Sequence, residues 1–464
     1  MARGELKEEA HPRPVPQAGG GDSEAQPEPE TGGEEGSAAI DPRIQRTRVR
    51  AGTLADAVKD VLGASAGKDT MPILGHVLIA AADGTIELTA TDLDQWACRS
   101  LASADPGEPD SAEWQRGSRG FSLTVPAKVL AAVLGEIDAD ALVTLIAPTS
   151  GSCAAAPGPG SASADETRLV LKAGRSRFKL PCLPAADFPL PPPTPSVAAF
   201  EIRASALADH FARVEHAIST EETRYYLNGV YVHPAQAAGE ALMLRFAATD
   251  GSRLARLAID SPEGAASWPP MIIARQTVAL LDKLLAGAAK SDVDAMVSVA
   301  AAGLEAGSRI SFAMPAADGG MVTLVAKTID GTFPDYGRVI PVAVEAQATI
   351  ERAPLAAALK RVGVLTAKSS RIVRCAFTEG KLTLTGSSPE LGEAAEELPC
   401  DLKGGDLTVG FDHQYLRAAL LACASDHVVL GLSGPSGPCR IEAVTHAEDE
   451  AGPALVQVVM PSRI

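Results

Sequence analysis

Three stretches of the chain repeat one pattern, in which a short strand leads into an amphipathic helix. They read VRAGTLADAVKDVL, IRASALADHFARVEHAIS and IERAPLAAALKRVGVL, and their anchor residues Leu54, Leu207 and Leu355 lie 153 and 148 residues apart. Apolar residues follow each anchor at i+4 and i+7, which predicts one buried stripe on each helix. Self-similarity at a fixed period indicates a chain built from three similar units in tandem.

Each copy continues in the same way after its first helix. A strand pair with turn residues follows, and then a second strand-to-helix step: LTVPAKVLAAVLGEI, MIIARQTVALLDKLLAG or LTVGFDHQYLRAALLACA. More strands and a proline-containing segment close the copy. The predicted order is β-α-β-β-α-β-β, an α+β arrangement in which two helices pack on one face of an antiparallel sheet. The predicted domains are copy 1 at 45–195, copy 2 at 196–343 and copy 3 at 344–464.

Two segments fall outside this plan. Residues 1–44 are rich in Gly, Pro and Glu and lack periodicity, so we expect a disordered acidic tail. Residues 147–166 (APTSGSCAAAPGPGSASADE) are of low complexity and predict a mobile insert between two strands of copy 1.

The charge of the chain is acidic overall, with a net value of −17. Nucleic-acid-binding domains are usually basic, so this balance alone speaks against DNA as a partner. Part of the charge is local, because residues 1–41 hold ten acids and three bases. The seven cysteines include no CxxC pair, which fits reduced thiols of the cytoplasm rather than a disulfide framework or a zinc site. No run of apolar residues approaches the roughly 18 needed to cross a bilayer, and the first residues lack a signal sequence.

The first helix of each copy carries basic residues on the face opposite its apolar stripe. These residues are Lys59, Arg213, Lys360 and Arg361. One interpretation is that they are ordinary solvated side chains. The other is that three equivalent helices contribute to one shared basic surface.

Six further motifs follow one another along the chain: MPILGHVLI, GRSRFKLPCLPAADFP, TRYYLNGVYV, ATDGSRLA, IDGTFPDYGRVIP and the terminal VVMPSRI. In this order they resemble the β subunit of bacterial DNA polymerase III, the sliding clamp, and the resemblance covers roughly residues 45–464. It implies a head-to-tail homodimeric ring that encircles duplex DNA, with sheet outside and helices inside. It implies no catalytic residues, no metal and no cofactor, and a function as processivity factor in the cytoplasm.

A ring that holds DNA topologically needs only weak, sequence-independent phosphate contacts, which reconciles the acidic balance with DNA as a partner. Gln276 stands where many relatives have lysine, which speaks against a strong contact there. The DNA-contacting residues implied by the resemblance are Lys68, Arg275, Lys59, Arg213, Lys283, Lys360, Arg361 and Arg417.

The resemblance also implies a pocket for short partner peptides of the type Gln-Leu-x-Leu-Phe. The partners implied are the replicative polymerase α subunit, the clamp loader, repair polymerases, and ligase or mismatch-repair proteins. Leucine, valine and methionine suit an apolar cleft, and a few polar groups would fix the direction of the peptide. Ser462 and Ser252 stand where methionine and histidine are common in the family. The pocket residues implied are Leu227, Thr249, Gly251, Arg253, Leu254, Pro334, Arg338, Val339, Val458, Met460, Pro461, Ser462 and Arg463.

A contact between two chains is implied at the ends of copies 1 and 3. We expect Arg175 and Arg177, on one face of a strand, to meet an acidic cluster of Glu393, Glu396 and Glu397 in the other chain. In the same contact, Phe178 would pack against Val364 and Leu365. Exposed ion pairs contribute little affinity, so the charges would mainly set the register.

Two rival interpretations remain, and the first is an enzyme. The segment GASAGKD (63–69) is similar to a phosphate-binding loop, but it has three residues rather than four between its glycines, and Asp69 stands where that loop has Ser or Thr. Asp92 and Asp250 occupy equivalent places in two copies, which favours turn capping over a catalytic pair. The second alternative is a paralogous accessory or inhibitor-resistant clamp that serves repair polymerases.

Overall fold

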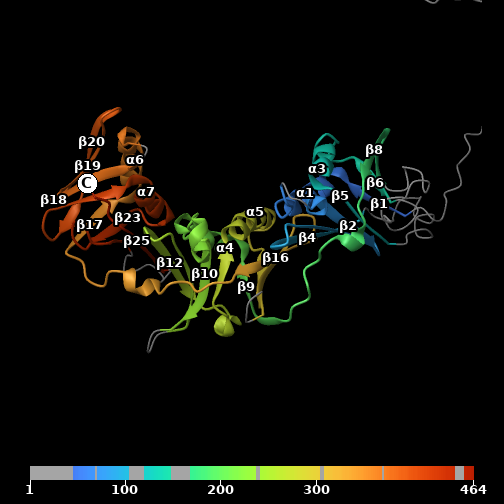
Figure 1. The fold of residues 1–464 in the computed structure, drawn as a ribbon, viewed down its shortest axis with the longest axis horizontal. Coiled ribbons are helices and arrows are strands. Elements are labelled where there is room, and N and C mark those ends of the chain that lie inside the picture. The colour runs from blue at the N-terminus through green and yellow to red at the C-terminus, as the bar shows by residue number, and fades with distance from the viewer. Residues whose placement is uncertain are drawn as a thin grey trace, which may run out of the picture. The chain divides into compact units, whose positions relative to one another are not determined.

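The computed structural model describes residues 45–67, 71–103, 120–147, 168–236, 241–303, 308–367, 370–444 and 454–463 (Figure 1). The predicted tail (1–44), all but the first residue of the predicted insert (147–166), and Lys68 lie outside the described residues.

Copy 1 begins with a strand that runs directly into a helix. Its elements are β1 (Arg46–Arg50), α1 (Ala51–Leu62), the 3-10 helix η1 (Pro72–Gly75), β2 (His76–Ala82), β3 (Thr85–Thr91), β4 (Gln95–Ala102), β5 (Phe121–Pro126), α3 (Ala127–Gly135), β6 (Leu142–Ile146), β7 (Arg168–Ala173), β8 (Ser176–Pro181) and η2 (Ala185–Asp187).

Copy 2 repeats this order, with additional 3-10 turns. Its elements are β9 (Ser196–Arg203), α4 (Ala204–Ala212), η3 (Glu215–Ala217), η4 (Glu222–Leu227), β10 (Gly229–Ala235), β11 (Met243–Thr249), β12 (Arg253–Asp260), η5 (Ala265–Ser267), β13 (Met271–Ala274), α5 (Arg275–Ser291), β14 (Met296–Ala302), β15 (Arg309–Pro315), β16 (Met321–Ile329) and η6 (Tyr336–Val339).

Copy 3 repeats it again. Its elements are β17 (Ala346–Glu351), α6 (Arg352–Val362), η7 (Gly363–Leu365), β18 (Ile372–Thr378), β19 (Lys381–Ser388), β20 (Gly392–Pro399), β21 (Asp401–Lys403), β22 (Leu407–Asp412), α7 (His413–Ala422), β23 (His427–Leu432), β24 (Cys439–Ala443) and β25 (Ala454–Val459).

The helices bury the predicted apolar stripes. In α1, Leu54, Val58 and Val61 are fully buried. The equivalent stripes of α4 and α6 are buried as well, so this prediction is confirmed. The two helices of each copy pack against one another, α1 with α3, α4 with α5 and α6 with α7, on their sheet (Figure 1). Each copy is therefore the predicted α+β unit.

The predicted strand count per copy was too low. Among the described residues, four strands rather than the predicted two separate the helices of copies 1 and 2 (β2–β5 and β10–β13), and five separate those of copy 3 (β18–β22). Three strands rather than two follow the second helix of each copy. The sequences of some of these strands hide them: β4 (QWACRSLA) is buried at most positions and so lacks the polar–apolar alternation of a half-exposed strand. Strand β20 (GEAAEELP) has few β-branched or aromatic residues.

Backbone pairing joins the copies to one another. Strand β4 of copy 1 pairs antiparallel with β16 of copy 2, and β12 of copy 2 pairs antiparallel with β25 of copy 3. Copies 1 and 3 each have a four-stranded sheet as well. Its strand order is β1-β6-β7-β8 in copy 1 and β20-β19-β18-β22 in copy 3. Strands β8 and β20 thus lie at the ends of these sheets.

A buried arginine reinforces the junction of copies 1 and 2. Arg99 of β4 has a side chain only 3% exposed, and it pairs with Asp60 of α1 at 3.1 Å and with Asp318 of the β15–β16 turn. Gly320 is required beside it, because a Cβ there would lie 2.0 Å from the Ser100 carbonyl oxygen. Loss of Arg99 would leave two partly buried carboxylates without their partner, which is strongly destabilising.

Candidate functional site

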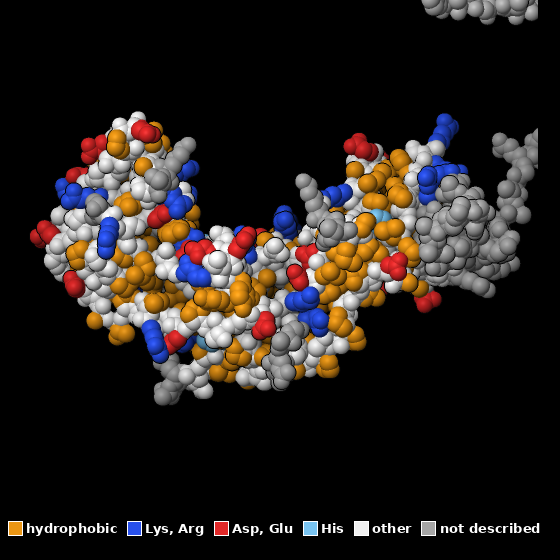
Figure 2. Space-filling view, in the orientation of Figure 1, with side chains coloured by type: hydrophobic (Ala, Val, Ile, Leu, Met, Phe, Trp, Pro, Cys, Tyr) orange, Lys and Arg blue, Asp and Glu red, His pale blue; other side chains and the backbone are white. Residues whose placement is uncertain are grey.

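An apolar pocket of about 270 Å³ lies where copy 2 meets copy 3. Its walls come from η4, the turn before β12, the segment after β16 and the end of β25. Figure 2 shows hydrophobic side chains gathered in the region of β10, β12 and β25. The lining residues are Arg224, Tyr226, Leu227, Thr249, Gly251, Arg253, Leu254, Pro334, Asp335, Tyr336, Val339, Val458 and Met460.

The pocket has a floor of its own, separate from the main core. Seven buried residues form this cluster: Leu227, Ala247, Leu254, Ile272, Phe333, Tyr336 and Val458. At the rim, Val339 is 48% exposed and Met460 is 39% exposed. Exposed apolar side chains above an apolar floor are typical of a surface that a partner covers, and methionine adapts readily to different ligands.

A tight turn forms the polar edge of the pocket. The Thr249 hydroxyl donates to the Arg253 carbonyl at 2.6 Å, and the Gly251 amide donates to the Thr249 hydroxyl at 3.1 Å. Asp250 accepts from the amides of Ser252 and Arg253 at 2.9 and 3.0 Å. Gly251 has φ +90°, a conformation that favours glycine. The carboxylate of Asp250 is therefore used to cap the turn.

The equivalent turn in copy 1 has the same bonds. Asp92 accepts from the amides of Asp94 and Gln95 at 3.0 and 2.9 Å, and the Thr91 hydroxyl donates to the Gln95 carbonyl at 2.8 Å. Both aspartates have the turn-capping role predicted for them, so they do not form a catalytic pair.

Arg253 links the pocket to the helix α7 of copy 3. Its Nε donates to Asp250 Oδ2 at 3.0 Å, and its guanidinium lies 4.1 Å from the ring centre of Tyr415. Arginine stacked on an aromatic face and paired with a carboxylate has little freedom to move. It therefore provides a fixed donor and positive charge at the edge of the apolar pocket.

Tyr336 is held in the pocket wall through His233. Nδ1 of His233 lies 2.9 Å from the Pro234 carbonyl oxygen, which can only accept, so Nδ1 carries the proton. Nε2 then accepts from the Tyr336 hydroxyl at 2.7 Å. Burial lowers the pKa of His233, which favours this neutral ring, and burial raises the pKa of Tyr336. Tyr231 stacks between His233 and Phe333, with ring centres 4.6 and 4.8 Å away.

The structure brings together nine of the thirteen predicted pocket residues. Four lie outside the lining. Arg338 is exposed and pairs with Asp335 at 2.9 Å, and the backbone amide of Ser462 donates to the Gly410 carbonyl at 2.8 Å. Pro461 and Arg463 lie beside Ser462 at the end of the described chain. Ser252 is exposed at the turn and also lies outside the lining.

Four lining residues were missed by the sequence prediction. Tyr336 and Asp335 lie inside the FPDYGRV motif, so the signal for them was present. Arg224 and Tyr226 lie within TRYYLNG beside the predicted Leu227. Only the fold places Arg224 against the turn at Gly251. The two residues are so close that a Cβ at Gly251 would lie 2.7 Å from Nη1 of Arg224.

The predicted DNA-contacting residues differ in their exposure to solvent and in whether an acidic side chain pairs with them. Five are exposed: Lys59, Arg275, Lys283, Lys360 and Arg361. Lys59 pairs with Asp56 at 3.1 Å, and Arg361 pairs with Glu396. Arg213 and Arg417 are half-buried, and Arg213 pairs with Asp209 at 2.7 Å. Figure 2 shows basic and acidic side chains interspersed over the middle of the face in view.

The predicted acidic cluster does not share one face. Strand alternation places Glu393 and Glu397 on the exposed face of β20, whereas Glu396 is half-buried on the α6 side, where it pairs with Arg361. Arg361 lowers the pKa of Glu396 through that hydrogen bond. The contact of the three glutamates with another chain stays a prediction, in which Glu396 starts from a bond within its own chain.

Arg175 also differs from its prediction. It lies in the two-residue turn before β8, because Gly174 adopts φ +55° there, so it does not share a strand face with Arg177. Phe178 is half-buried against the core, Leu365 is half-buried and Val364 is 68% exposed.

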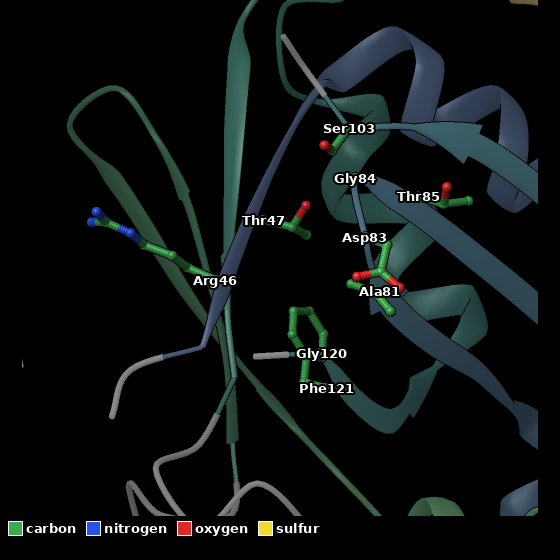
Figure 3. Close-up of a pocket in the computed structure, with 10 residues that line it drawn as sticks. Arg46, Thr47, Ala81, Asp83, Gly84, Thr85, Ser103, Gly120 and Phe121 are labelled. Carbon is green, nitrogen blue, oxygen red and sulfur yellow. The ribbon is translucent and has the colours of Figure 1, made fainter. Parts of the chain in front are cut away.

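Two further cavities lack the features of a binding site. One holds about 50 Å³, room for a few water molecules, and Figure 3 shows the Arg46 side chain extending away from the other labelled residues. The other, about 350 Å³, lies between α1, α5 and the β15–β16 turn. Its charges are already paired, Lys59 with Asp56 and Arg99 with Asp60 and Asp318.

Among the described residues, no group of three or more His, Cys, Asp or Glu side chains is arranged to hold a metal ion. Within the same ranges, no helix is both long enough and apolar enough to span a membrane.

Three α+β units joined through their sheets, with one apolar pocket at a junction, define a class of tandem-repeat binding proteins. Comparison with known families makes the class specific. Models of the N-terminal, central and C-terminal domains of the DNA polymerase III beta subunit match residues 46–150, 201–335 and 337–463.

Known relatives and structures agree with these matches. The beta sliding clamp of Caulobacter vibrioides is 34% identical over 399 residues, which cover 86% of this chain and 94% of that protein. A sliding clamp from Bartonella birtlesii, solved with bound griselimycin, superposes with a TM-score of 0.77 at 29% identity and covers 91% of this chain and 100% of that one. The C. crescentus clamp, solved with polyethylene glycol bound at a region proposed to tether beta-motifs, superposes with a TM-score of 0.77 at 30% identity. The match covers 91% of this chain and 99% of that one.

The chain belongs to the DNA polymerase III beta subunit family, the bacterial beta sliding clamps. It is a non-catalytic component of the polymerase and acts as a processivity factor in DNA replication.

Proposed function

We propose that the pocket between copies 2 and 3 is the place where this clamp tethers the replicative polymerase and other partners. The observation that carries the proposal is the buried apolar floor beneath the exposed Val339 and Met460. Arg253, fixed between Asp250 and Tyr415, supplies a polar contact that sets the direction of a bound chain.

The proposed ligand is a short peptide of the type Gln-Leu-x-Leu-Phe. Its leucine and phenylalanine would enter the apolar space bounded by Leu227, Leu254 and Val458. A peptide of this length covers little surface, so the expected affinity is micromolar, about −8 kcal/mol. The proposed partners are the polymerase α subunit, the clamp loader, repair polymerases, and ligase or mismatch-repair proteins, acting on the chromosome in the cytoplasm.

The proposed assembly is a head-to-tail dimeric ring around duplex DNA. Its support is the pair of terminal strands, β8 in copy 1 and β20 in copy 3. Terminal strands present unpaired backbone groups, and pairing β8 of one chain with β20 of another would satisfy both. Exposed Val364 lies in η7, which packs against β20, so it is placed to be buried by such a contact.

A paralogous clamp for repair polymerases was the alternative function. Its support was the acidic segment 1–44, which lies outside the described residues, together with Ser252 and Ser462, at two positions expected near the peptide. Neither side chain lines the pocket, so the pocket gives that alternative no specific support.

Titration of a fluorescent Gln-Leu-x-Leu-Phe peptide tests the proposed pocket. Met460→Ala should weaken binding roughly tenfold, because an apolar side chain that lines the pocket is lost. Met296→Ala is the matched control, since Met296 is similarly exposed at 44% but lies on β14, and it should leave the affinity unchanged. Equal affinities for the wild type and Met460→Ala would contradict the pocket assignment.

A further inference from the structure

The junction of copies 1 and 2 repeats the strand pairing that frames the pocket. At the open pocket, Leu254 of β12 lies opposite Val458 of β25. At the other junction, Trp96 of β4 lies opposite Val325 of β16. Trp96 and Leu254 each stand five residues after the threonine of their ATD turns, Thr91 and Thr249. Trp96 therefore holds the place that Leu254 holds in the pocket wall.

The next residues of the two outer strands are equivalent too. The Met460 amide donates to the Ser252 carbonyl at 2.9 Å, and the Lys327 amide donates to the Asp94 carbonyl at 2.8 Å. Lys327 thus occupies the backbone position of Met460, the apolar residue at the pocket rim. Its ammonium pairs with Asp94 at 3.1 Å and lies 5.9 Å from the ring centre of Trp96.

The apolar floor is also repeated. Leu74, at the end of η1, accepts at its carbonyl from the Ala66 amide at 2.9 Å, as Leu227 accepts from Ser219 at 3.1 Å. Around Leu74 lies a buried cluster that is separate from the main core: Ile73, Leu74, Leu78 and Phe188. It corresponds to the cluster beneath the open pocket.

The difference between the junctions is what fills the space above the floor. In copy 2, Leu254 and Pro334 belong to different walls of the open pocket. In copy 1, the indole of Trp96 reaches from β4 to the segment after Phe188, where its Nε1 donates to the Pro189 carbonyl at 2.9 Å. Trp96 is only 4% exposed, so its ring closes the space that stays open in copy 2.

We propose that the junction of copies 1 and 2 is a second partner pocket, permanently occupied by the side chain of Trp96. Trp96 thereby restricts each chain to one peptide site, and Lys327 removes the apolar rim that a peptide would need. The inference rests on the proposed function of the open pocket, because the ligand excluded by Trp96 is the peptide that the open pocket binds.

The test is to rebuild the lining of the open pocket at the closed one. The double variant Trp96→Leu, Lys327→Met gives the closed junction the same residue types that the open pocket has at the equivalent positions, Leu254 and Met460. Calorimetric titration with the Gln-Leu-x-Leu-Phe peptide should give one site per chain for the wild type and two for the variant. Trp268→Leu is the control, because Trp268 is also buried, beside Phe200 at 5.1 Å, and should leave one site.

A second measurement does not depend on the peptide. Trp96→Gly removes the whole side chain and leaves a space where an indole ring fitted, so free indole should raise its melting temperature and leave that of the wild type unchanged. A folded double variant with one site, or a folded Trp96→Gly protein that does not respond to indole, would overturn the proposal. A wild type that binds no peptide would instead contradict the proposed function, and the indole measurement would still decide the closed pocket.

Discussion

Polar side chains with little or no solvent access lie where copy 2 meets copy 3. Gln457 of β25 is fully buried, and its Nε2 donates to the Ala419 carbonyl at 2.7 Å and lies 3.3 Å from Cys423 Sγ. His216 of η3, in copy 2, interacts with Gln457, so a titratable side chain of copy 2 lies against copy 3.

The protonation of His216 should make that junction sensitive to acid. Burial, together with the positive charge of Arg253, lowers the pKa of His216 from 6.5 to about 4. Below pH 6.5 the unfolded chain takes up a proton that the folded chain excludes. The stability associated with neutral His216 is therefore complete above pH 6.5 and is lost as the pH falls toward 4, by about 3 kcal/mol in all.

The measurement is the free energy of unfolding of the wild type and of His216→Gln between pH 7 and pH 4. The wild type should lose more stability than the variant over this range. His427→Gln, at an exposed histidine, is the control and should follow the wild type. Parallel curves for the wild type and His216→Gln would show that His216 does not titrate as expected.

At the residue scale, the sequence identified pocket residues that lie within a recognisable motif. It did not identify residues whose role depends on a partner far away in the sequence. Leu227, Leu254 and Val458 lie in motifs and line the pocket. The role of His233 depends on its distance to Tyr336, 103 residues away, which no local pattern contains. The closing of the second junction by Trp96 likewise follows from its bond to Pro189, 93 residues away.

Among the secondary-structure elements, α7 has the clearest local cause for where it begins. The Asp412 carboxylate accepts from the amides of Gln414 and Tyr415 at 2.8 and 3.3 Å, as a helix N-cap does. Its other oxygen pairs with Arg371 at 3.2 Å. Because α7 carries Tyr415, on which Arg253 stacks, this cap also supports the pocket edge.

Removal of the cap should loosen α7. Asp412→Ala should lower local stability by about 1–2 kcal/mol, so the amides of α7 should exchange with deuterium roughly 5- to 30-fold faster. Asp406→Ala, at an exposed position before β22, should leave exchange unchanged. Unaltered exchange in Asp412→Ala would mean that the side chain contributes nothing to the helix.

Helices and strands could be predicted where their own sequence carries a periodic pattern, and not where their pairing with other strands decides the structure. The first helices follow from a single stripe, since Leu54, Val58 and Val61 are all buried. Strands such as β4 depend on neighbours on both sides, β3 and β16, and tertiary pairing rather than local alternation makes them strands.

At the scale of the whole molecule, the terminal strands β8 and β20 predict a dimer of about 95 kDa, twice the 47.7 kDa of one chain. Burial of an apolar side chain such as Val364 contributes roughly 1.5–3 kcal/mol. Val364→Asp should therefore shift sedimentation at micromolar concentration from dimer to monomer. Val342→Asp makes the same change at a valine that is 96% exposed and should leave the dimer intact. A wild-type monomer under these conditions would contradict the ring.

The interspersed charges and the net charge of −17 predict that DNA is held by closure of the ring and only weakly by attraction. Retention on DNA after loading by the cognate clamp loader tests this most directly. On a circular DNA the protein should remain bound after removal of free protein, and it should be lost as soon as a restriction enzyme linearises the circle. Equal retention on circular and linear DNA would contradict the account.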